Sequence, residues 1–141
     1  MSIHAPYHFK TQAHRSEKKM SAINVTKAQF EELILKEGTV LVDFWAAWCG
    51  PCRSFAPIFE AASDKYPEMT FAKVDTEAEQ SLSAAAGITS IPTLMIFRDG
   101  ILLFSQPGAL PASGLDDLIS QVSALNMDEI RKEIAADTAK Q

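Results

Sequence analysis

The feature that most constrains the fold is an apolar run, residues 39–46, that leads directly into a pair of cysteines. The run is rich in β-branched and aromatic residues and hardly alternates with polar ones. This pattern is typical of a strand buried on both faces, as in the middle of a parallel sheet. Beyond the cysteines, apolar side chains recur at helical spacing, at Phe55, Ile58, Phe59 and Ala62. The sequence therefore predicts a buried strand that ends where a helix begins.

Cys49 and Cys52 are the only cysteines of the 141 residues, and they stand at the start of this helix. Residues three apart in a first helical turn share a face, close enough for a disulfide without backbone distortion. Free backbone N–H groups and the positive end of the helix dipole favour the thiolate at the first position. We therefore expect Cys49 to attack a substrate disulfide, and Cys52, further in and more shielded, to resolve the mixed disulfide.

A zinc half-site or a purely stabilising disulfide would use the same two residues, but no other cysteine is present to complete a zinc site. All three histidines lie within residues 1–20, so the rest of the chain lacks Cys–His and Ser–His–Asp chemistry. The net charge of −5 is the balance of +3 in residues 1–20 and −8 in the remainder. That balance argues against nucleic acid as the main partner.

The order of elements predicts one α/β domain with an extension at each end. Residues 1–20 show no periodicity, and we interpret them as a disordered basic tail. The rest reads β-α-β-α-β-α-β-β-α, which favours right-handed parallel crossovers followed by an antiparallel hairpin. Strands are expected at residues 22–25, 39–46, 70–75, 93–97 and 101–105, and helices at residues 26–36, 50–65, 76–86 and from 111 onward. Residues 126–141 are expected to add a helical extension.

Local signals set several of these boundaries. Thr26 and Gln29 form one capping-box pattern and Thr76 and Glu79 another, so each predicts the start of a helix. Asp99-Gly100 predicts the hairpin turn, because this pair suits turns that need a positive φ.

The chain resembles the thioredoxin family over residues 21–125. A bare C-x-x-C would be weak evidence, but a preceding tryptophan, an intervening Gly-Pro and a later Ile-Pro-Thr make the set specific. The matching segments are residues 42–52 (with Trp48-Cys49-Gly50-Pro51-Cys52) and 72–75, then Ile91-Pro92-Thr93, Asp99-Gly100 and Gly108-Ala109. The resemblance implies the thioredoxin fold, a central mixed sheet with three parallel strands plus an antiparallel hairpin and helices on both faces. Residues 1–20 and 126–141 fall outside the family's minimal domain.

The resemblance also implies roles for two charged residues. Asp43 lies within the buried strand, where desolvation disfavours its charge. By analogy with the family it accepts the proton of Cys52, and Lys73 is the lysine that accompanies it. A buried ion pair that serves only fold specificity would place the same two residues there.

The substrate surface is expected around Cys49. The resemblance makes Pro92 a cis proline that faces the disulfide, whereas a trans proline at the start of a strand is the structural alternative. Small residues around a tryptophan would leave backbone accessible for loose docking of many protein disulfides. The expected rim consists of Trp48, Gly50, Pro51, Ile91, Pro92 and Gly108.

The resemblance implies a general protein-disulfide reductase. Gly50-Pro51 lacks the histidine that oxidising relatives carry, which favours a reductant over an oxidant. The expected protein is a cytoplasmic monomer without a bound cofactor or metal, recharged by NADPH through a flavin-containing thioredoxin reductase, with disulfide-bearing proteins as clients and neither nucleic acid nor membrane as partner. The rival hypothesis is a binding subunit or holdase that uses the same surface without redox turnover.

Overall fold

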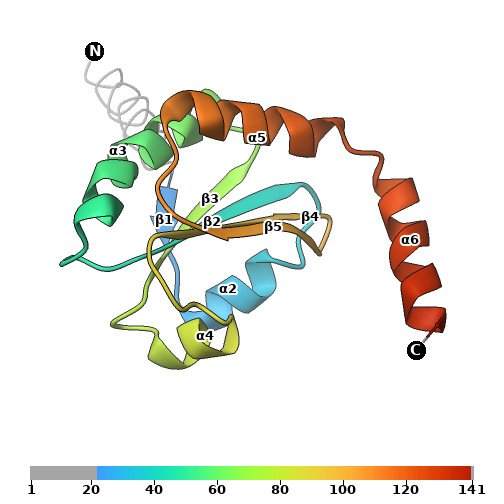
Figure 1. Ribbon diagram of the computed structural model, residues 1–141, viewed down its shortest axis with the longest axis horizontal. Helices are drawn as coiled ribbons and strands as arrows, with labels where there is room; N and C mark the ends of the chain where they lie inside the picture. The colour runs from blue at the N-terminus through green and yellow to red at the C-terminus, as the bar shows by residue number, and fades with distance from the viewer. Residues whose placement is uncertain (1–21, 141) are drawn as a thin grey trace, which may run out of the picture.

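The computed structural model describes residues 22–140 and shows a five-stranded sheet covered by helices (Figure 1). The strands lie in the order β1-β3-β2-β4-β5. β1, β3 and β2 are parallel, and β4 and β5 continue the sheet antiparallel. Their bounds are β1 (Ala22–Asn24), β2 (Thr39–Trp45), β3 (Thr70–Asp75), β4 (Thr93–Arg98) and β5 (Ile101–Pro107). The predicted mixed sheet is confirmed.

The tail predicted for residues 1–20 lies outside the described residues. Within residues 22–140, no helix has the length and apolar character needed to cross a membrane.

β2 is the central strand, and residues 40–44 are all buried. It pairs with β3 in parallel, which sets Asp43 opposite Lys73, and with β4 antiparallel, which sets Asp43 opposite Leu94. The predicted burial of both faces is confirmed. One neighbour is antiparallel because β2 pairs with the first strand of the hairpin rather than with another crossover strand.

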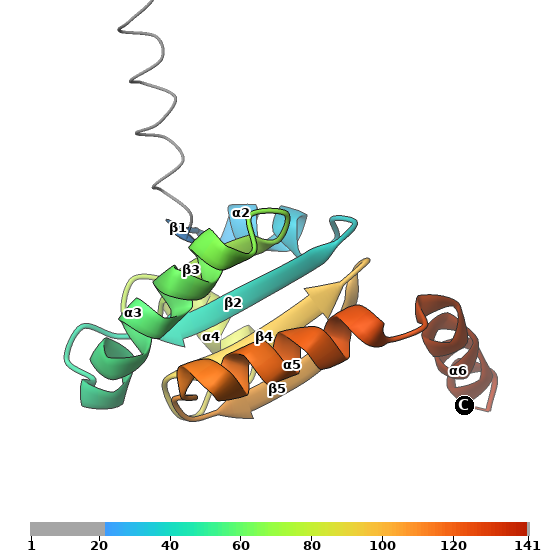
Figure 2. The same ribbon diagram turned by 90° about the horizontal axis from the view of Figure 1, so that it is seen from above.

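Helices cover both faces of the sheet (Figure 2). On one face lie α2 (Lys27–Leu33) and α4 (Gln80–Ala85), and on the other α3 (Gly50–Lys65) and α5 (Ala112–Ala124). Phe44 packs with Phe30 of α2 on the first face, and Leu41 packs with Phe55 of α3 on the second. Because side chains alternate along a strand, Asp43 shares the α3 face with Leu41. The sheet therefore points a carboxyl group toward the helix that carries Cys52.

The capping box predicted at α2 is confirmed. The side chain of Thr26 accepts the N–H of Gln29, and the side chain of Gln29 accepts the N–H of Thr26. The helix ends at Leu33 rather than at residue 36, because the amides of Leu35 and Lys36 donate to carbonyls three residues back instead of four.

The capping box predicted at Thr76–Glu79 is wrong. The Thr76 hydroxyl donates to the Trp45 carbonyl, 3.0 Å away, and so does not cap a helix. The Asp75 side chain instead accepts the N–H of Glu77, which holds a turn, and α4 begins only at Gln80.

The predicted hairpin turn is confirmed, since Asp99 and Gly100 have φ values of 54° and 83°. After α5 the chain enters α6 (Met127–Ala139), which stands apart from the sheet in both views (Figures 1 and 2). Arg98 of β4 donates to the carbonyls of Val122 and Leu125 and so caps the end of α5. α6 confirms the helix expected after residue 126. The domain boundary expected at residue 125 stays a prediction.

Candidate redox site

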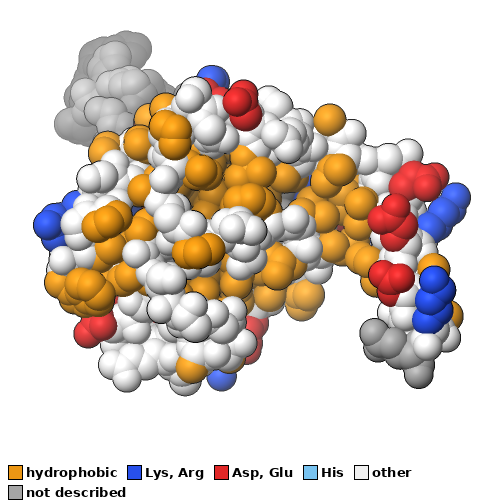
Figure 3. Space-filling model, in the orientation of Figure 1, with side chains coloured by type: hydrophobic (Ala, Val, Ile, Leu, Met, Phe, Trp, Pro, Cys, Tyr) orange, Lys and Arg blue, Asp and Glu red, His pale blue; other side chains and the backbone are white. Residues whose placement is uncertain are grey.

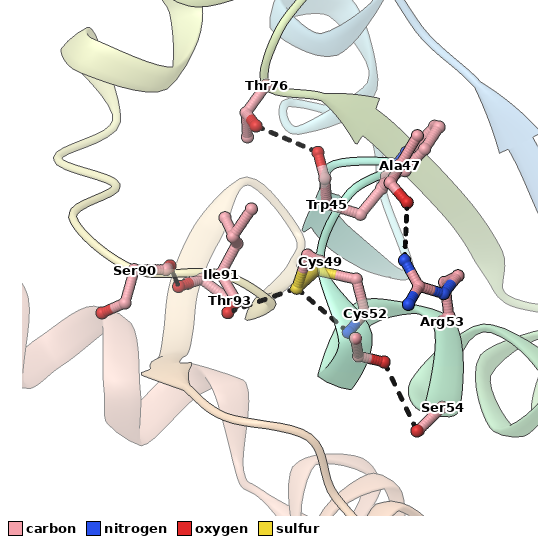
Figure 4. The surroundings of a disulfide bond; sticks show 11 residues. Trp45, Ala47, Cys49, Cys52, Arg53, Ser54, Thr76, Ser90, Ile91 and Thr93 are labelled. Carbon is pink, nitrogen blue, oxygen red and sulfur yellow. Dashed lines mark hydrogen bonds between the residues drawn. A yellow bond between two sulfur atoms is a disulfide. The ribbon is translucent and has the colours of Figure 1, made fainter.

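Cys49 and Cys52 meet where β2 passes into α3 (Figure 4). Cys49 immediately precedes the first turn, and Pro51 occupies that turn, where its missing N–H has no intrahelical partner. The two cysteines form a disulfide, with Cα atoms 5.2 Å apart. The backbone N–H of Cys52 donates to the Cys49 sulfur at 3.1 Å. The helix start therefore directs a hydrogen-bond donor at the sulfur of Cys49.

The two cysteines are buried to nearly the same extent, 4% exposed for Cys49 and 3% for Cys52. The expected difference in shielding is therefore not seen in exposed area. The two residues differ instead in the space that each one lines. Cys49 lines a surface hollow of about 520 Å³, here called the outer hollow. Cys52 lines a different space of about 260 Å³, here called the inner cavity.

The outer hollow contains four of the expected rim residues, Trp48, Gly50, Pro51 and Ile91. Trp48 is 68% exposed and makes an apolar projection at its edge. All of the residues that line the outer hollow are uncharged. Those that sequence reasoning did not identify are Thr76, Ser83, Ile88, Thr89 and Ser90.

Pro92 and Gly108, the other two rim residues, lie next to the outer hollow. The Ile91–Pro92 peptide bond is cis, as predicted, and the Ile91 carbonyl oxygen lies 3.7 Å from the Cys49 sulfur. The N–H of Gly108 donates to the Pro92 carbonyl at 2.7 Å, which ties the end of β5 to this loop. The structure thus brings four of the expected rim residues to the hollow that Cys49 lines, and Pro92 and Gly108 adjoin them through the peptide bond to Ile91 and the hydrogen bond to Pro92.

The inner cavity brings Asp43 and Lys73 to Cys52. It is also lined by Trp45 and Arg53 and by three alanines, Ala46, Ala47 and Ala56. The Lys73 ammonium lies 5.1 Å from the centre of a Trp45 ring, a cation–π contact that holds both side chains. The two charged residues proposed from the sequence therefore share one space with the second sulfur.

Asp43 is strongly desolvated. It is 1% exposed, and neither carboxyl oxygen has a hydrogen-bond partner among residues 22–140. Burial raises the pKa of Asp43 from 3.8 to about 7, and the positive charge of Lys73 opposes that rise. A carboxyl with this pKa exchanges protons readily near neutral pH.

Sequence analysis did not identify two groups of the residues that line these spaces. Arg53 follows Cys52 directly, and only the fold shows that its side chain turns back toward Ala47. Thr76 and Ser83 come from the loop after β3 and from α4, elements separated in sequence from the cysteines. A threonine after a buried strand and a serine within a short helix carry no pattern that marks them as site residues.

Fold and site together define a class of protein, the α/β thiol–disulfide oxidoreductases that act through one dithiol at a helix start. A family model described as Thioredoxin matches residues 21–121. The chain is 48% identical over 120 residues to "Putative thioredoxin 2" of Streptomyces coelicolor, covering 85% of this chain and 90% of the relative. It is 43% identical over 95 residues to thioredoxin of Pseudomonas aeruginosa, covering 66% and 88%.

Solved structures agree with these matches. A thioredoxin of Malassezia sympodialis (Mala s 13) superposes with a TM-score of 0.67 at 34% identity, covering 74% of this chain and 92% of the other. A mutant thioredoxin of Halobacterium salinarum gives 0.69 at 30% identity, covering 75% and 94%. The chain belongs to the thioredoxin family. It is a thiol–disulfide oxidoreductase with protein-disulfide reductase activity, and the family works without a bound cofactor.

Proposed function

We propose that Cys49 is the attacking cysteine and Cys52 the resolving one. The observation that carries this assignment is that the two cysteines line different spaces, Cys49 the outer hollow and Cys52 the inner cavity with Asp43. The Cys49 thiolate attacks a client disulfide, forms a mixed disulfide and releases the first client thiolate. The Cys52 sulfur then attacks the Cys49 sulfur and releases the second client thiolate. Two electrons pass to the client, and the Cys49–Cys52 disulfide remains.

Asp43 is the proposed acceptor of the Cys52 proton in the second step. With a pKa of about 7, part of the Asp43 population is ionised at neutral pH and can take up that proton. Lys73 supports the ionised form through its charge. The six rim residues are the proposed client surface, with the backbone of Ile91 beside the Cys49 sulfur offering hydrogen bonds to an extended client segment.

Reduction of insulin disulfides tests the assignment. With dithiothreitol as electron donor, the native chain should turn over and Cys49→Ser should not. In the absence of dithiothreitol, reduced Cys52→Ser should attack once and accumulate a mixed disulfide, which dithiothreitol then releases. Absence of turnover by the native chain would instead favour the redox-independent binding subunit.

The proposed electron source is NADPH, delivered by a flavin-containing thioredoxin reductase, and the proposed setting is a cytoplasmic monomer with disulfide-bearing clients. Oxidation of NADPH by a purified bacterial thioredoxin reductase should depend on the oxidised chain and vanish with Cys49→Ser. A reductase that leaves NADPH unconsumed while dithiothreitol still drives insulin reduction would overturn the proposed donor and leave the cysteine assignment intact.

A further inference from the structure

Arg53 has an unusual position for an exposed side chain in the first turn of α3. Its Nη1 donates to the carbonyl of Ala47 at 2.9 Å, back across the turn that carries Trp48 and Cys49 (Figure 4). Its Nη2 stands 4.0 Å from the place that a β-carbon on Gly50 would occupy. The guanidinium therefore spans the turn from residue 47 to residue 50 and holds it against α3.

The same side chain forms part of the wall of the inner cavity, and so does Ala47 at the other end of the hydrogen bond. Both residues are exposed, whereas Asp43, which lines the same space, is 1% exposed. The hydrogen bond from Arg53 to Ala47 therefore joins two residues of the solvent-exposed part of the cavity wall. On the sheet, the partner of Asp43 on β3 is Lys73 and its partner on β4 is the apolar Leu94.

We propose that Arg53 is a positioning residue that acts on Asp43 by keeping the mouth of the inner cavity narrow. The bond to Ala47 fixes the outer wall, and the fixed wall limits how much water reaches the carboxyl group. The functional consequence, control of the pH at which Cys52 loses its proton, rests on the role proposed above for Asp43.

A steric role and an electrostatic role of Arg53 predict opposite changes in the pKa of Asp43 when the side chain is removed. If the guanidinium acted on Asp43 through its charge, removing it would disfavour the carboxylate and raise the pKa of Asp43. An exposed cation is strongly screened by water, so this effect is small. If the guanidinium acts as a wall, removing it admits water, stabilises the carboxylate and lowers the pKa. The sign of the change distinguishes the two roles.

The test is a carboxyl-carbon NMR titration of Asp43 in the oxidised full-length chain, with Arg53→Ala compared with the native protein. We expect the pKa of Asp43 to fall by roughly half a pH unit or more. Amide exchange at Cys49, whose N–H donates to the Ala46 carbonyl within this turn, should become faster. Arg131→Ala is the matched control, since Arg131 pairs with Asp128 on α6 and should leave both readouts unchanged. An unchanged or higher pKa in Arg53→Ala overturns the proposal.

A second measurement separates this inference from the proposed role of Asp43. The pH profile for the step in which Cys52 resolves the mixed disulfide, followed in a single turnover of the reduced chain with insulin, should move to lower pH in Arg53→Ala. It should not move further when Arg53→Ala is added to Asp43→Asn. If NMR shows the lower pKa while the profile stays in place, the positioning role of Arg53 stands and proton transfer to Asp43 is wrong.

Discussion

The two sides of the Cys49–Cys52 disulfide differ in charge. The outer hollow has uncharged lining residues, several of them with hydroxyl groups, and an exposed tryptophan at its edge. Apolar side chains are also frequent on the face of the domain that Figure 3 shows. The inner cavity holds a desolvated carboxyl group with two cationic side chains, Lys73 and Arg53. With the roles proposed above, client contact and proton exchange would take place on opposite sides of one bond. Substitutions at the outer hollow should then change the KM for protein disulfides and leave the pKa of Asp43 unchanged. Substitutions in the inner cavity should have the opposite pattern.

The largest effect is expected from Asp43→Asn, which removes the ionisable carboxyl group of the inner cavity. The pKa of Asp43 is about 7 in the folded chain and near 3.8 when exposed, so unfolding releases protons between these pH values and native stability falls as pH rises through this range. The charged carboxyl therefore costs at most about 4 kcal/mol above pH 7 and nothing below about pH 4.

Denaturant unfolding of the oxidised protein checks this expectation. Asp43→Asn should be more stable than the native chain at pH 8 and equal to it at pH 4. Equal stability of the two proteins at both pH values would mean that the carboxyl is not desolvated. The outer side should be spared, so the KM for insulin should stay close to the native value.

An intermediate effect is expected from Trp48→Ala, which removes the projecting side chain of the outer hollow. Loss of an exposed aromatic contact should raise the KM for protein disulfides roughly 5- to 10-fold, because such side chains often dominate docking energy. The pKa of Asp43 and the stability curve with pH should not change.

Steady-state insulin reduction measures the change in KM, and Leu35→Ala is the matched control. Leu35 is 73% exposed and lines neither of the two spaces, so its loss should leave KM unaltered. A similar KM for Trp48→Ala and the native protein would remove Trp48 from the client surface.

The smallest effect is expected from Lys73→Gln, which removes the positive charge that opposes the rise in the pKa of Asp43. The pKa of Asp43 should increase by a fraction of a pH unit, and resolution of the mixed disulfide by Cys52 should require slightly higher pH. NMR titration of the carboxyl carbon measures this directly. The direction is opposite to that expected for Arg53→Ala, so a fall in pKa would contradict the assigned electrostatic role of Lys73.

The sequence predicted well those features that depend on neighbouring residues. The uninterrupted apolar run identified β2, the Thr26–Gln29 pair identified the start of α2, and Asp99-Gly100 identified the hairpin turn. Each depends on backbone preferences or on burial of a whole segment, and both are visible in a short window of sequence.

Features that depend on distant partners were predicted less well. Thr76 has the same side chain as Thr26, but the carbonyl of Trp45 lies within its reach, and that contact replaces the helix cap. Both Cys49 and Cys52 are buried, and Ile91, 42 positions after Cys49, packs against them. The reach of Arg53 to Ala47 follows from the turn between β2 and α3. None of these contacts has a signature in the local sequence.

The disulfide joins residues only three positions apart, at the start of one helix. A ring this small restricts the unfolded chain little, and its entropic contribution to stability is about 2 kcal/mol in the loop-closure treatment. The sheet and the two helix layers are instead held by their own apolar cores. Opening and closing the bond therefore stores and delivers an electron pair while the scaffold stays folded, which lets one molecule serve many successive cycles.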